Sequence, residues 1–300
     1  MKRLLFIYNP KAGRQRVRGM LPDLLEVFAR EGYETTVHPT MAQGEAASVT
    51  TARAGQYDRL VCCGGDGTLN ETVGGLLALP EDKRPVLGYI PTGTTNDFAR
   101  TLGLPRSTEK LAEVACGGVP RAVDVGDSAG RVFTYVSAFG LFTDVSYSTP
   151  QTTKNLLGHF AYVLEGAGRL LNIPSYHMEV VADGGREISG DFIYGMVSNT
   201  LSVGGMMSLP RDQVKLDDGR FEVLLVRPPR TPKDWQSIIA SLKAQQAQRE
   251  DGAVTGFTAS RVSFRCDQPV AWTVDGEFGG EREETTIQNL PKALLIACGV

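Results

Sequence analysis

The sequence predicts an N-terminal α/β domain with a mostly parallel sheet, followed by a C-terminal antiparallel β-sandwich. The chain has 300 residues, a comfortable length for two domains. Strand and helix patterns alternate over the first 125 or so residues. After about residue 121, closely spaced strand patterns separated by turn residues predominate. We therefore expect residues 1–127 to form the first domain and residues 128–300 the second.

The first domain is predicted from short apolar strands that alternate with helical patterns. Strands are expected at residues 4–8, 33–38, 60–63 and 85–90, and helices at residues 20–31, 44–54, 69–79 and 96–101. The helix at 20–31 has leucine and phenylalanine at helical spacing and ends at Gly32. The apolar run at 4–8 is too short for a signal peptide and is interpreted as a buried strand. This alternation is typical of parallel strands with helices on the faces of the sheet.

The second domain is predicted from many short strands. They are expected at residues 122–125, 132–139, 177–182, 191–198, 221–227, 261–266, 271–274 and 292–298. Two helices interrupt them, an apolar one at 156–171 and one at 235–246 whose apolar residues recur at helical spacing. The last eleven residues either return to the first domain or complete the sandwich. No apolar stretch is long enough to cross a bilayer, so we expect a soluble protein.

Composition excludes several classes of protein. The chain is 42% hydrophobic and 22% charged, which is typical of a globular protein. Its 31 basic and 34 acidic residues give a net charge of −3, so bulk charge does not favour nucleic-acid binding. The 5 cysteines form no C-x-x-C pair, which argues against zinc. Their odd number favours a reducing, cytoplasmic setting.

The strongest local signal is the loop Gly-Gly-Asp-Gly-Thr at residues 64–68, between a predicted strand and a predicted helix. Glycines allow a ligand to approach the backbone, and a helix N-terminus favours phosphate. Asp66 would repel bare phosphate but suits a divalent cation bound between acid and phosphate. The loop is neither a P-loop nor a dinucleotide fingerprint, because Asn70 stands at the third glycine position. A simple tight turn is the alternative.

Two further loops follow predicted strands. Residues 91–98 read Pro-Thr-Gly-Thr-Thr-Asn-Asp-Phe, and residues 9–13 read Asn-Pro-Lys-Ala-Gly before three arginines. Ligands of open α/β sheets bind at the carboxyl ends of strands, where all three loops are expected. An ordinary helix cap and a solvated basic turn are the respective alternatives.

A different chemistry is suggested by Gly-Asp-Ser-Ala-Gly at residues 126–130, which matches the G-x-S-x-G nucleophile elbow of serine hydrolases. That motif requires a helix after the serine, whereas a strand pattern follows Ser128. A β-hairpin turn is favoured. His159 and His177 could in principle complete a triad, but their apolar-helix and strand contexts favour packed or capped roles.

The motifs NPKAG, GGDGT and PTGTTNDFAR together resemble those of the bacterial diacylglycerol kinase and related lipid-kinase family, which includes the sphingosine and ceramide kinases. The segments VDVGD, LGHFAYVLEG, LDDGRFEV and VDGE extend the resemblance over nearly the whole chain. It implies an NAD-kinase-like first domain, with ATP bound between the two domains and transferred to a lipid hydroxyl, most simply that of diacylglycerol. An NAD kinase-type phosphotransferase is the alternative, since NAD kinases share a similar GGDGT loop. A non-catalytic lipid- or nucleotide-binding protein is a third possibility.

The resemblance also implies roles for individual residues. Nucleotide contacts would come from Asn9, Pro10, Lys11, Ala12, Gly13, Thr40, Gly64, Gly65, Asp66, Gly67, Thr68, Asn70, Glu71 and Thr94. Asp66, Asp97 and Asp124 would organise the catalytic Mg²⁺, in agreement with the preference of this ion for few carboxylates, water and phosphate.

In the second domain, Glu277 is the expected general base for the lipid hydroxyl, and Asp275 is the second choice. Read without the resemblance, this element is a hairpin turn. A structural Mg²⁺ would be held by Asp218 and the backbone carbonyls of Lys215 and Arg220, where the alternative is a solvated Asp-Gly turn. The resemblance also implies a homodimer, and action on a lipid implies peripheral binding at the inner membrane face.

Overall fold

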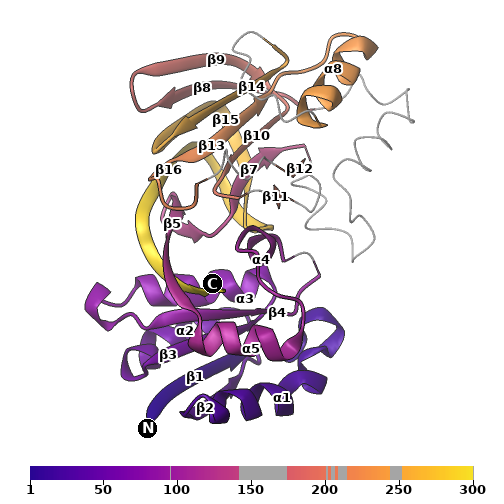
Figure 1. The fold of residues 1–300 in the computed structure, drawn as a ribbon. Coiled ribbons are helices and arrows are strands. Elements are labelled where there is room, and N and C mark those ends of the chain that lie inside the picture. The colour runs from indigo at the N-terminus through magenta and orange to yellow at the C-terminus, as the bar shows by residue number, and fades with distance from the viewer. Residues whose placement is uncertain are drawn as a thin grey trace. The chain divides into compact units, whose positions relative to one another are not determined.

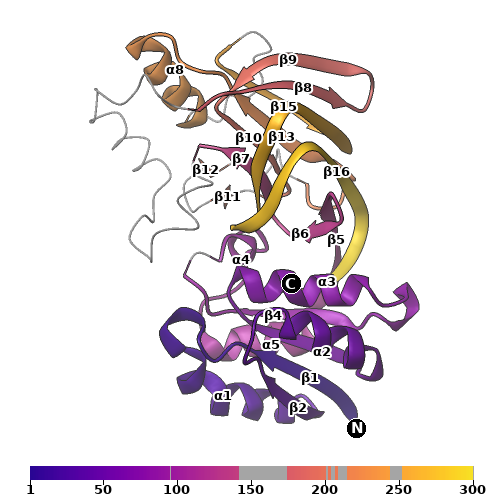
Figure 2. The same cartoon turned by 180° about the vertical axis from the view of Figure 1, so that it is seen from behind.

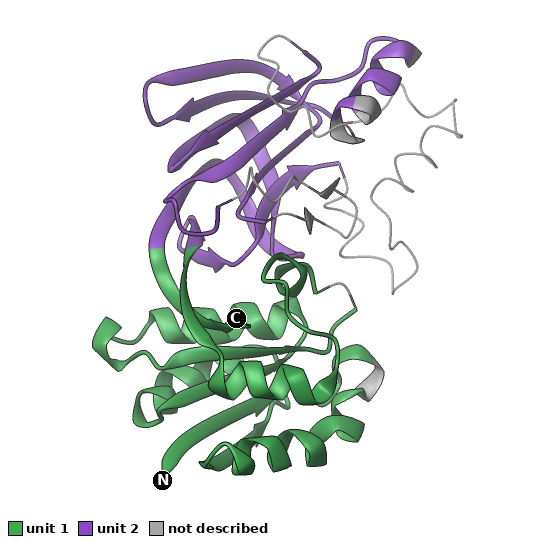
Figure 3. Ribbon diagram, in the orientation of Figure 1, with its two compact units in different colours: residues 1–124, 292–300 green, residues 125–291 purple. Residues whose placement is uncertain are grey.

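The computed structural model describes residues 1–94, 96–141, 174–200, 202–203, 207–208, 215–243 and 252–299 (Figure 1). The chain forms two compact units (Figure 3). The first contains Met1–Asp124 and Lys292–Val300, and the second contains Val125–Pro291. The helix expected at residues 156–171 lies outside the described residues. Among the described helices, none has the length and apolarity needed to span a bilayer.

A parallel sheet forms the centre of the first unit. Its order is β16-β4-β3-β1-β2, with β1 (Lys2–Tyr8), β2 (Tyr33–Pro39), β3 (Arg59–Gly64), β4 (Val86–Pro91) and the last part of β16 (Glu277–Cys298). The C-terminal strand returns to this sheet, because Ile296 pairs in parallel with Leu87. Strands β1 and β3 read as continuous apolar runs because helices bury the sheet on both faces.

Five α-helices of the first unit cover this sheet or connect its strands. They are α1 (Val17–Arg30), α2 (Glu45–Arg53), α3 (Asp66–Leu77), α4 (Asp97–Thr101) and α5 (Thr108–Gly117), with short 3₁₀ turns at Ala12–Gln15, Ala54–Gln56 and Glu81–Lys83. Helices α1 and α5 pack on one face with Phe6 and Val61 (Figure 1), and α2 and α3 lie on the other (Figure 2). The sequence patterns did not predict α5, whose buried face relies on the small residues Ala112 and Ala115.

The second unit is built of antiparallel strands. They are β5 (Val119–Ser128), β6 (Arg131–Phe133), β7 (Val136–Gly140), β8 (Tyr176–Ala182), β9 (Arg186–Phe192), β10 (Tyr194–Ser198), β13 (Phe221–Val226), β14 (Val254–Ala259), β15 (Arg261–Val274) and β16. Their main order is β14-β13-β10-β7-β15-β16; in addition, β8 pairs with β15 and β9, and β5 pairs with β6. The short strands β11 (Ser202–Val203) and β12 (Met207–Ser208) pair with each other. The predicted strand-rich C-terminal region is confirmed.

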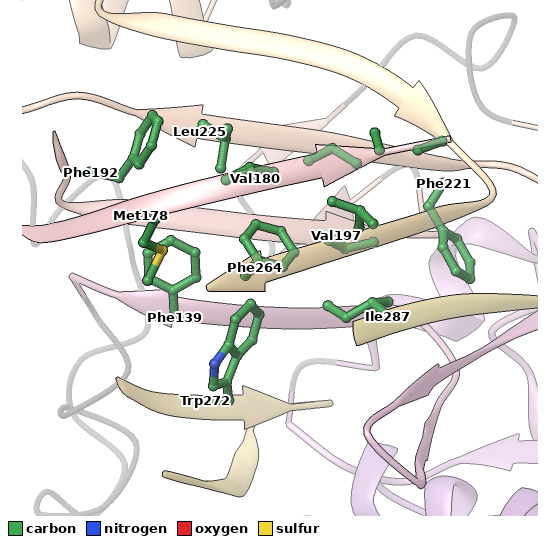
Figure 4. Packing of buried hydrophobic residues seen from close by; sticks show 14 of the residues in the cluster. Phe139, Met178, Val180, Phe192, Val197, Phe221, Leu225, Phe264, Trp272 and Ile287 are labelled. Atoms are coloured by element: carbon green, nitrogen blue, oxygen red, sulfur yellow. The ribbon is translucent and has the colours of Figure 1, made fainter. Parts of the chain in front are cut away.

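An aromatic cluster forms the core of the second unit (Figure 4). The Phe139 and Trp272 ring centroids are 5.0 Å apart, and those of Phe264 and Trp272 are 5.1 Å apart. Aromatic pairs at such distances add to the stabilisation from buried area. Helix α8 (Pro232–Lys243) starts three residues before the predicted helix and buries Trp235 and Ile238.

Several predicted strand boundaries differ from those in the structure. The strand expected at 132–139 is divided into β6 and β7, because the backbone N–H groups of Thr134 and Tyr135 donate to the side chain of Asp275. The segment at 191–198 spans the end of β9 and all of β10. The two strands expected at 261–266 and 271–274 form one strand, β15, with a register shift in its pairing to β16.

All five cysteines are free and buried. Cys62 and Cys63 lie side by side in the sequence in β3, where burial raises the pKa of the Cys62 thiol to about 12. All five cysteines thus contribute buried thiols to the packing of the protein.

Candidate functional site

Three loops of the first unit pack closely at the carboxyl ends of β1, β3 and β4. Gly13 has a φ of 53°, and a Cβ there would overlap the carbonyl oxygen of Thr92. A Cβ on Gly93 would lie 2.6 Å from the Cα of Gly65. At both positions backbone approaches backbone, so only glycine fits without displacement. The three loops that the sequence suggested separately are therefore parts of one site.

Hydrogen bonds join the same loops. Asn9 Nδ2 donates to Thr68 Oγ1 at 3.3 Å, and Asn9 Oδ1 accepts from the Lys11 N–H at 2.9 Å. The backbone N–H of Asn96 donates to Asp66 Oδ2 at 3.1 Å. These contacts hold the loop after β1 and the loop after β4 against the start of α3.

Helix α3 begins at Asp66, three residues before the predicted start. Gly67 and Thr68 therefore lie in its first turn rather than in a loop, and Asn70 and Glu71 lie in the helix as predicted. The first N–H groups of a helix have no partner within the helix, and the helix dipole favours negative charge there. The arrangement can bind phosphate, with Asp66 placed to hold a cation beside it.

Two further expected nucleotide contacts, Glu71 and Thr40, bond to neighbouring elements. The Glu71 carboxylate accepts from the backbone N–H groups of Gly44 at 2.8 Å and Ala46 at 3.2 Å, which caps the N-terminus of α2. Thr40 is buried, and its N–H donates to the Tyr8 carbonyl at 2.9 Å. Glu71 and Thr40 thus stabilise the elements around the loops. Two other expected nucleotide contacts, Lys11 and Thr94, are exposed to solvent.

The other two acids of the expected Mg²⁺ network are buried. Asp97 is the first residue of α4, directly after the residue bonded to Asp66. Asp124 Oδ1 accepts from the Lys292 N–H at 2.7 Å, which anchors the returning C-terminal segment. Within the described part of the chain, no three acidic, histidine or cysteine side chains are grouped to hold a metal ion. Water and phosphate oxygens would have to complete the shell of a cation at Asp66.

Asp275 and Glu277 differ sharply in their surroundings. Asp275 and Gly276, with φ values of 49° and 80°, form the two-residue turn between β15 and β16. The buried Asp275 carboxylate accepts four hydrogen bonds, from the N–H groups of residues 134, 135 and 136 and from the Thr134 hydroxyl. The Glu277 side chain is 41% exposed and lies 3.5 Å from Arg131 Nη2. Glu277 therefore has the more accessible carboxylate.

The turn at residues 215–220 leads into β13. Asp218 Oδ1 accepts from the Arg220 N–H at 3.0 Å, and Gly219 has a φ of 75°. Lys215, Asp218 and Arg220 are exposed. Burial raises the pKa of Glu222, the second residue of β13, to about 8, and the nearby Asp218 carboxylate acts in the same direction. The sequence patterns gave no reason to select Glu222.

Ser128 does not have the context of a nucleophile elbow. It ends β5, and Ala129 and Gly130 turn the chain into strand β6 rather than into a helix. The buried Ser128 hydroxyl is 3.0 Å from the Ser137 hydroxyl. His177 is exposed and lies 2.8 Å from Asp191, and His159 lies outside the described residues.

Two residues of the segment 91–98 that hold the loops together are absent from the predicted site residues. Gly93 packs on Gly65, and Asn96 bonds Asp66, yet only Thr94 and Asp97 were chosen from that segment. A usable signal was present, because asparagine tolerates the left-handed backbone that Asn96 adopts at a φ of 52°.

Comparison with known proteins gives a consistent result. Residues 3–128 match the diacylglycerol kinase catalytic domain. A diacylglycerol kinase of Bacillus subtilis (strain 168) is 35% identical over 282 residues, which cover 93% of this chain and 91% of the relative. One of Staphylococcus carnosus (strain TM300) is 34% identical, with 93% and 90% covered. A solved structure from Bacillus anthracis str. Sterne, assigned as a diacylglycerol kinase, is 25% identical with a TM-score of 0.80, covering 99% of this chain and 98% of that one.

The glycine loops, the α/β unit with its strand-rich companion and these similarities define a lipid kinase. The chain belongs to the diacylglycerol kinase family.

Proposed function

We propose that this enzyme transfers the γ-phosphate of ATP to the free hydroxyl of diacylglycerol and so produces phosphatidic acid. The observation that carries the proposal is the joining of three glycine-containing loops around the N-terminus of α3. The names of the relatives point to the same acceptor. The alternative, an NAD kinase, predicts a soluble dinucleotide acceptor. It is less favoured, because the similar proteins are named diacylglycerol kinases.

The first unit would hold ATP through its phosphates. The N-terminus of α3 and residues 9–13 supply N–H groups and the Lys11 charge. Asp66, with Asp97 and Asp124, would hold Mg²⁺, which neutralises phosphate charge when bound. The rigid contacts among the loops keep Asp66 in place before the nucleotide binds, and such preorganisation is a main source of catalysis in phosphoryl transfer.

Glu277 is our candidate for the general base. As the lipid oxygen forms its bond to the γ-phosphorus, the bond from that phosphorus to the β–γ bridging oxygen breaks and ADP leaves. Glu277 accepts the hydroxyl proton in this step. Asp275 fits a positioning role better, because four hydrogen bonds already occupy its carboxylate and fix the turn that carries Glu277.

The turn at 215–220 is our candidate for a structural Mg²⁺ site. Asp218 would supply a carboxylate oxygen, and Lys215 and Arg220 would supply backbone carbonyls. The buried, unpartnered Oε2 of nearby Glu222 is consistent with a cation at this turn. The expected position of ATP between the domains, the homodimer and peripheral binding at the inner membrane face all remain predictions.

Substitution of the two proposed reacting-site carboxylates tests the proposal. Asp66→Asn and Glu277→Gln should each lower the rate of phosphate transfer to diacylglycerol by on the order of 100-fold or more. Glu284→Gln, at an exposed position of the same strand as Glu277, is the matched control and should leave the rate unchanged. Folding of each variant is checked by thermal unfolding. A folded Asp66→Asn or Glu277→Gln enzyme with the wild-type rate contradicts the proposal.

A further inference from the structure

Glu222 lies in the middle of a row of side chains that crosses three strands of the second unit. It pairs with Ser198 of β10 on one side and with Thr258 of β14 on the other. Directly opposed residues of antiparallel strands project from the same face, with Cβ atoms about 5 Å apart. Ser198, Glu222 and Thr258 therefore share one face.

Two oxygen atoms in this row are buried without a hydrogen-bond partner. They are Oε2 of Glu222 and Oγ of the fully buried Ser198. Buried polar groups in folded proteins are nearly always satisfied, and an unsatisfied carboxylate oxygen is especially costly. Two adjacent exceptions on one face indicate that a group which binds oxygen atoms belongs between them.

Glu222 lacks a basic partner among the residues that the structure describes. Within the described part of the chain, its carboxylate forms no ion pair. Arg220 projects from the same face but donates from Nε to the Thr258 hydroxyl at 3.1 Å and from Nη2 to the Thr258 carbonyl at 2.8 Å. Asp218, in the turn before β13, adds a second negative charge nearby.

A small divalent cation between Glu222 and Ser198 would satisfy both unpartnered oxygen atoms. Hard cations such as Mg²⁺ and Ca²⁺ bind carboxylate, hydroxyl and carbonyl oxygens together, often with water. A basic ligand is the alternative, but the nearby Asp218 supplies a second carboxylate, and two carboxylates favour a divalent cation. The chemistry of the donor set therefore selects a metal ion.

We propose that Glu222 Oε2 and Ser198 Oγ are ligands, directly or through water, of the divalent cation that we assign to the turn at residues 215–220. The inference rests on that proposed metal site and extends it from the exposed turn into the buried face of the sheet. It accounts for the presence of a glutamate in an otherwise apolar strand, Phe221–Val226. The site then fastens the turn to β10 and β13.

Thermal unfolding without ATP or lipid tests this assignment. The melting temperature is measured in EDTA and over a titration with MgCl₂ or CaCl₂. Wild-type protein should be stabilised by one of the two cations, because ligands that bind only the folded state raise its stability. Glu222→Gln should raise the apparent Kd for the cation on the order of 10-fold or more. In EDTA it should unfold at or above the wild-type temperature, because the buried carboxylate with its unpartnered oxygen is gone.

Three other variants test whether the cation response depends specifically on the proposed ligands. Ser198→Ala removes one hydroxyl and should weaken cation binding without lowering the melting temperature in EDTA, which keeps the test valid if Glu222→Gln fails to fold. Glu179→Gln, at an exposed position of strand β8, is the matched control and should respond like wild type. Glu284→Gln, at an exposed position of strand β16, should also keep the response.

The outcomes separate this inference from the kinase assignment. A cation response equal to wild type in both Glu222→Gln and Ser198→Ala overturns the inference even if the enzyme phosphorylates diacylglycerol. Absence of any response in wild type overturns it as well. A response that is lost in Asp218→Asn and Glu222→Gln supports it even if no lipid is phosphorylated.

Discussion

The backbone N–H of Asn96 donates a hydrogen bond to Asp66 Oδ2 at 3.1 Å and so joins the loop after β4 to the first residue of α3. Asn96 can take this position because it adopts a left-handed backbone conformation, which its own Nδ2 stabilises by donating to the Gly93 carbonyl at 2.9 Å. The loop after β4 thereby helps to orient the Asp66 side chain. This hydrogen bond helps to hold the carboxylate that we propose as a ligand of Mg²⁺.

The close packing of the loops predicts a specific glycine requirement. Gly93→Ala should destabilise the protein by about 1–3 kcal/mol and lower phosphate transfer strongly, because the new Cβ would lie 2.6 Å from the Gly65 backbone. Gly74→Ala is the matched control, since nothing lies within 4 Å of a Cβ at this position of α3. It should stabilise the protein by about 0.5–1 kcal/mol. Urea unfolding and initial rates measure both effects, and equal behaviour of the two variants would show that the loops are not tightly packed.

Asp275 is predicted to act on structure rather than on the proton. Asp275→Asn should lower the free energy of unfolding by about 2–4 kcal/mol, because an amide cannot accept all four hydrogen bonds that the carboxylate accepts. Asp267→Asn, at an exposed position of the same strand, should have little effect. If Asp275→Asn keeps wild-type stability in urea but loses phosphate transfer, Asp275 and not Glu277 is the better candidate for the base.

Glu45 gives the first unit a predictable dependence on pH. The N–H of Met41, the His38 side chain and the N–H of Ala42 all bond its carboxylate and lower its pKa below the ordinary value of 4.5. In acid, the unfolded chain therefore binds this proton first. The stabilisation is present above pH 4.5 and is lost as the pH falls through the lower folded-state pKa.

Substitution of Glu45 should remove this part of the acid sensitivity. The urea midpoint of Glu45→Gln should fall less than that of wild type between neutral pH and the acid range, whereas Glu34→Gln, at an exposed position of β2, should follow wild type. If Glu45→Gln loses as much stability in acid as wild type does, the three hydrogen bonds do not stabilise the charged carboxylate.

Local patterns predicted the first unit well because its elements are defined by neighbouring residues. Strands such as Arg59–Gly64 are apolar on both faces, and the glycine loops stand directly after them. The second unit was less predictable, because its strand boundaries depend on distant residues. Thr134 lies between β6 and β7, and its N–H donates to the Asp275 side chain, which is 141 positions away in the sequence. No window of sequence around Thr134 contains that information.

The candidate site also combines features that local sequence predicts with features that depend on distant residues. The sequence indicated the three loops and their acidic residues. It could not show that Gly93 packs on Gly65, or that the Glu71 carboxylate caps the N-terminus of α2. The cross-strand row that places Ser198 beside Glu222 depends on the pairing of β10 with β13, which only the fold defines.

The identity of the phosphorylated product tests the central claim most directly. The protein is incubated with ATP labelled in the γ-phosphate and MgCl₂, with diacylglycerol and other lipid alcohols in mixed micelles and with NAD in a parallel reaction. We predict label in phosphatidic acid, abolished by EDTA and by Asp66→Asn. Label in NADP alone, or no label in any lipid while the folded protein still binds ATP, would contradict the assignment of this chain as a diacylglycerol kinase.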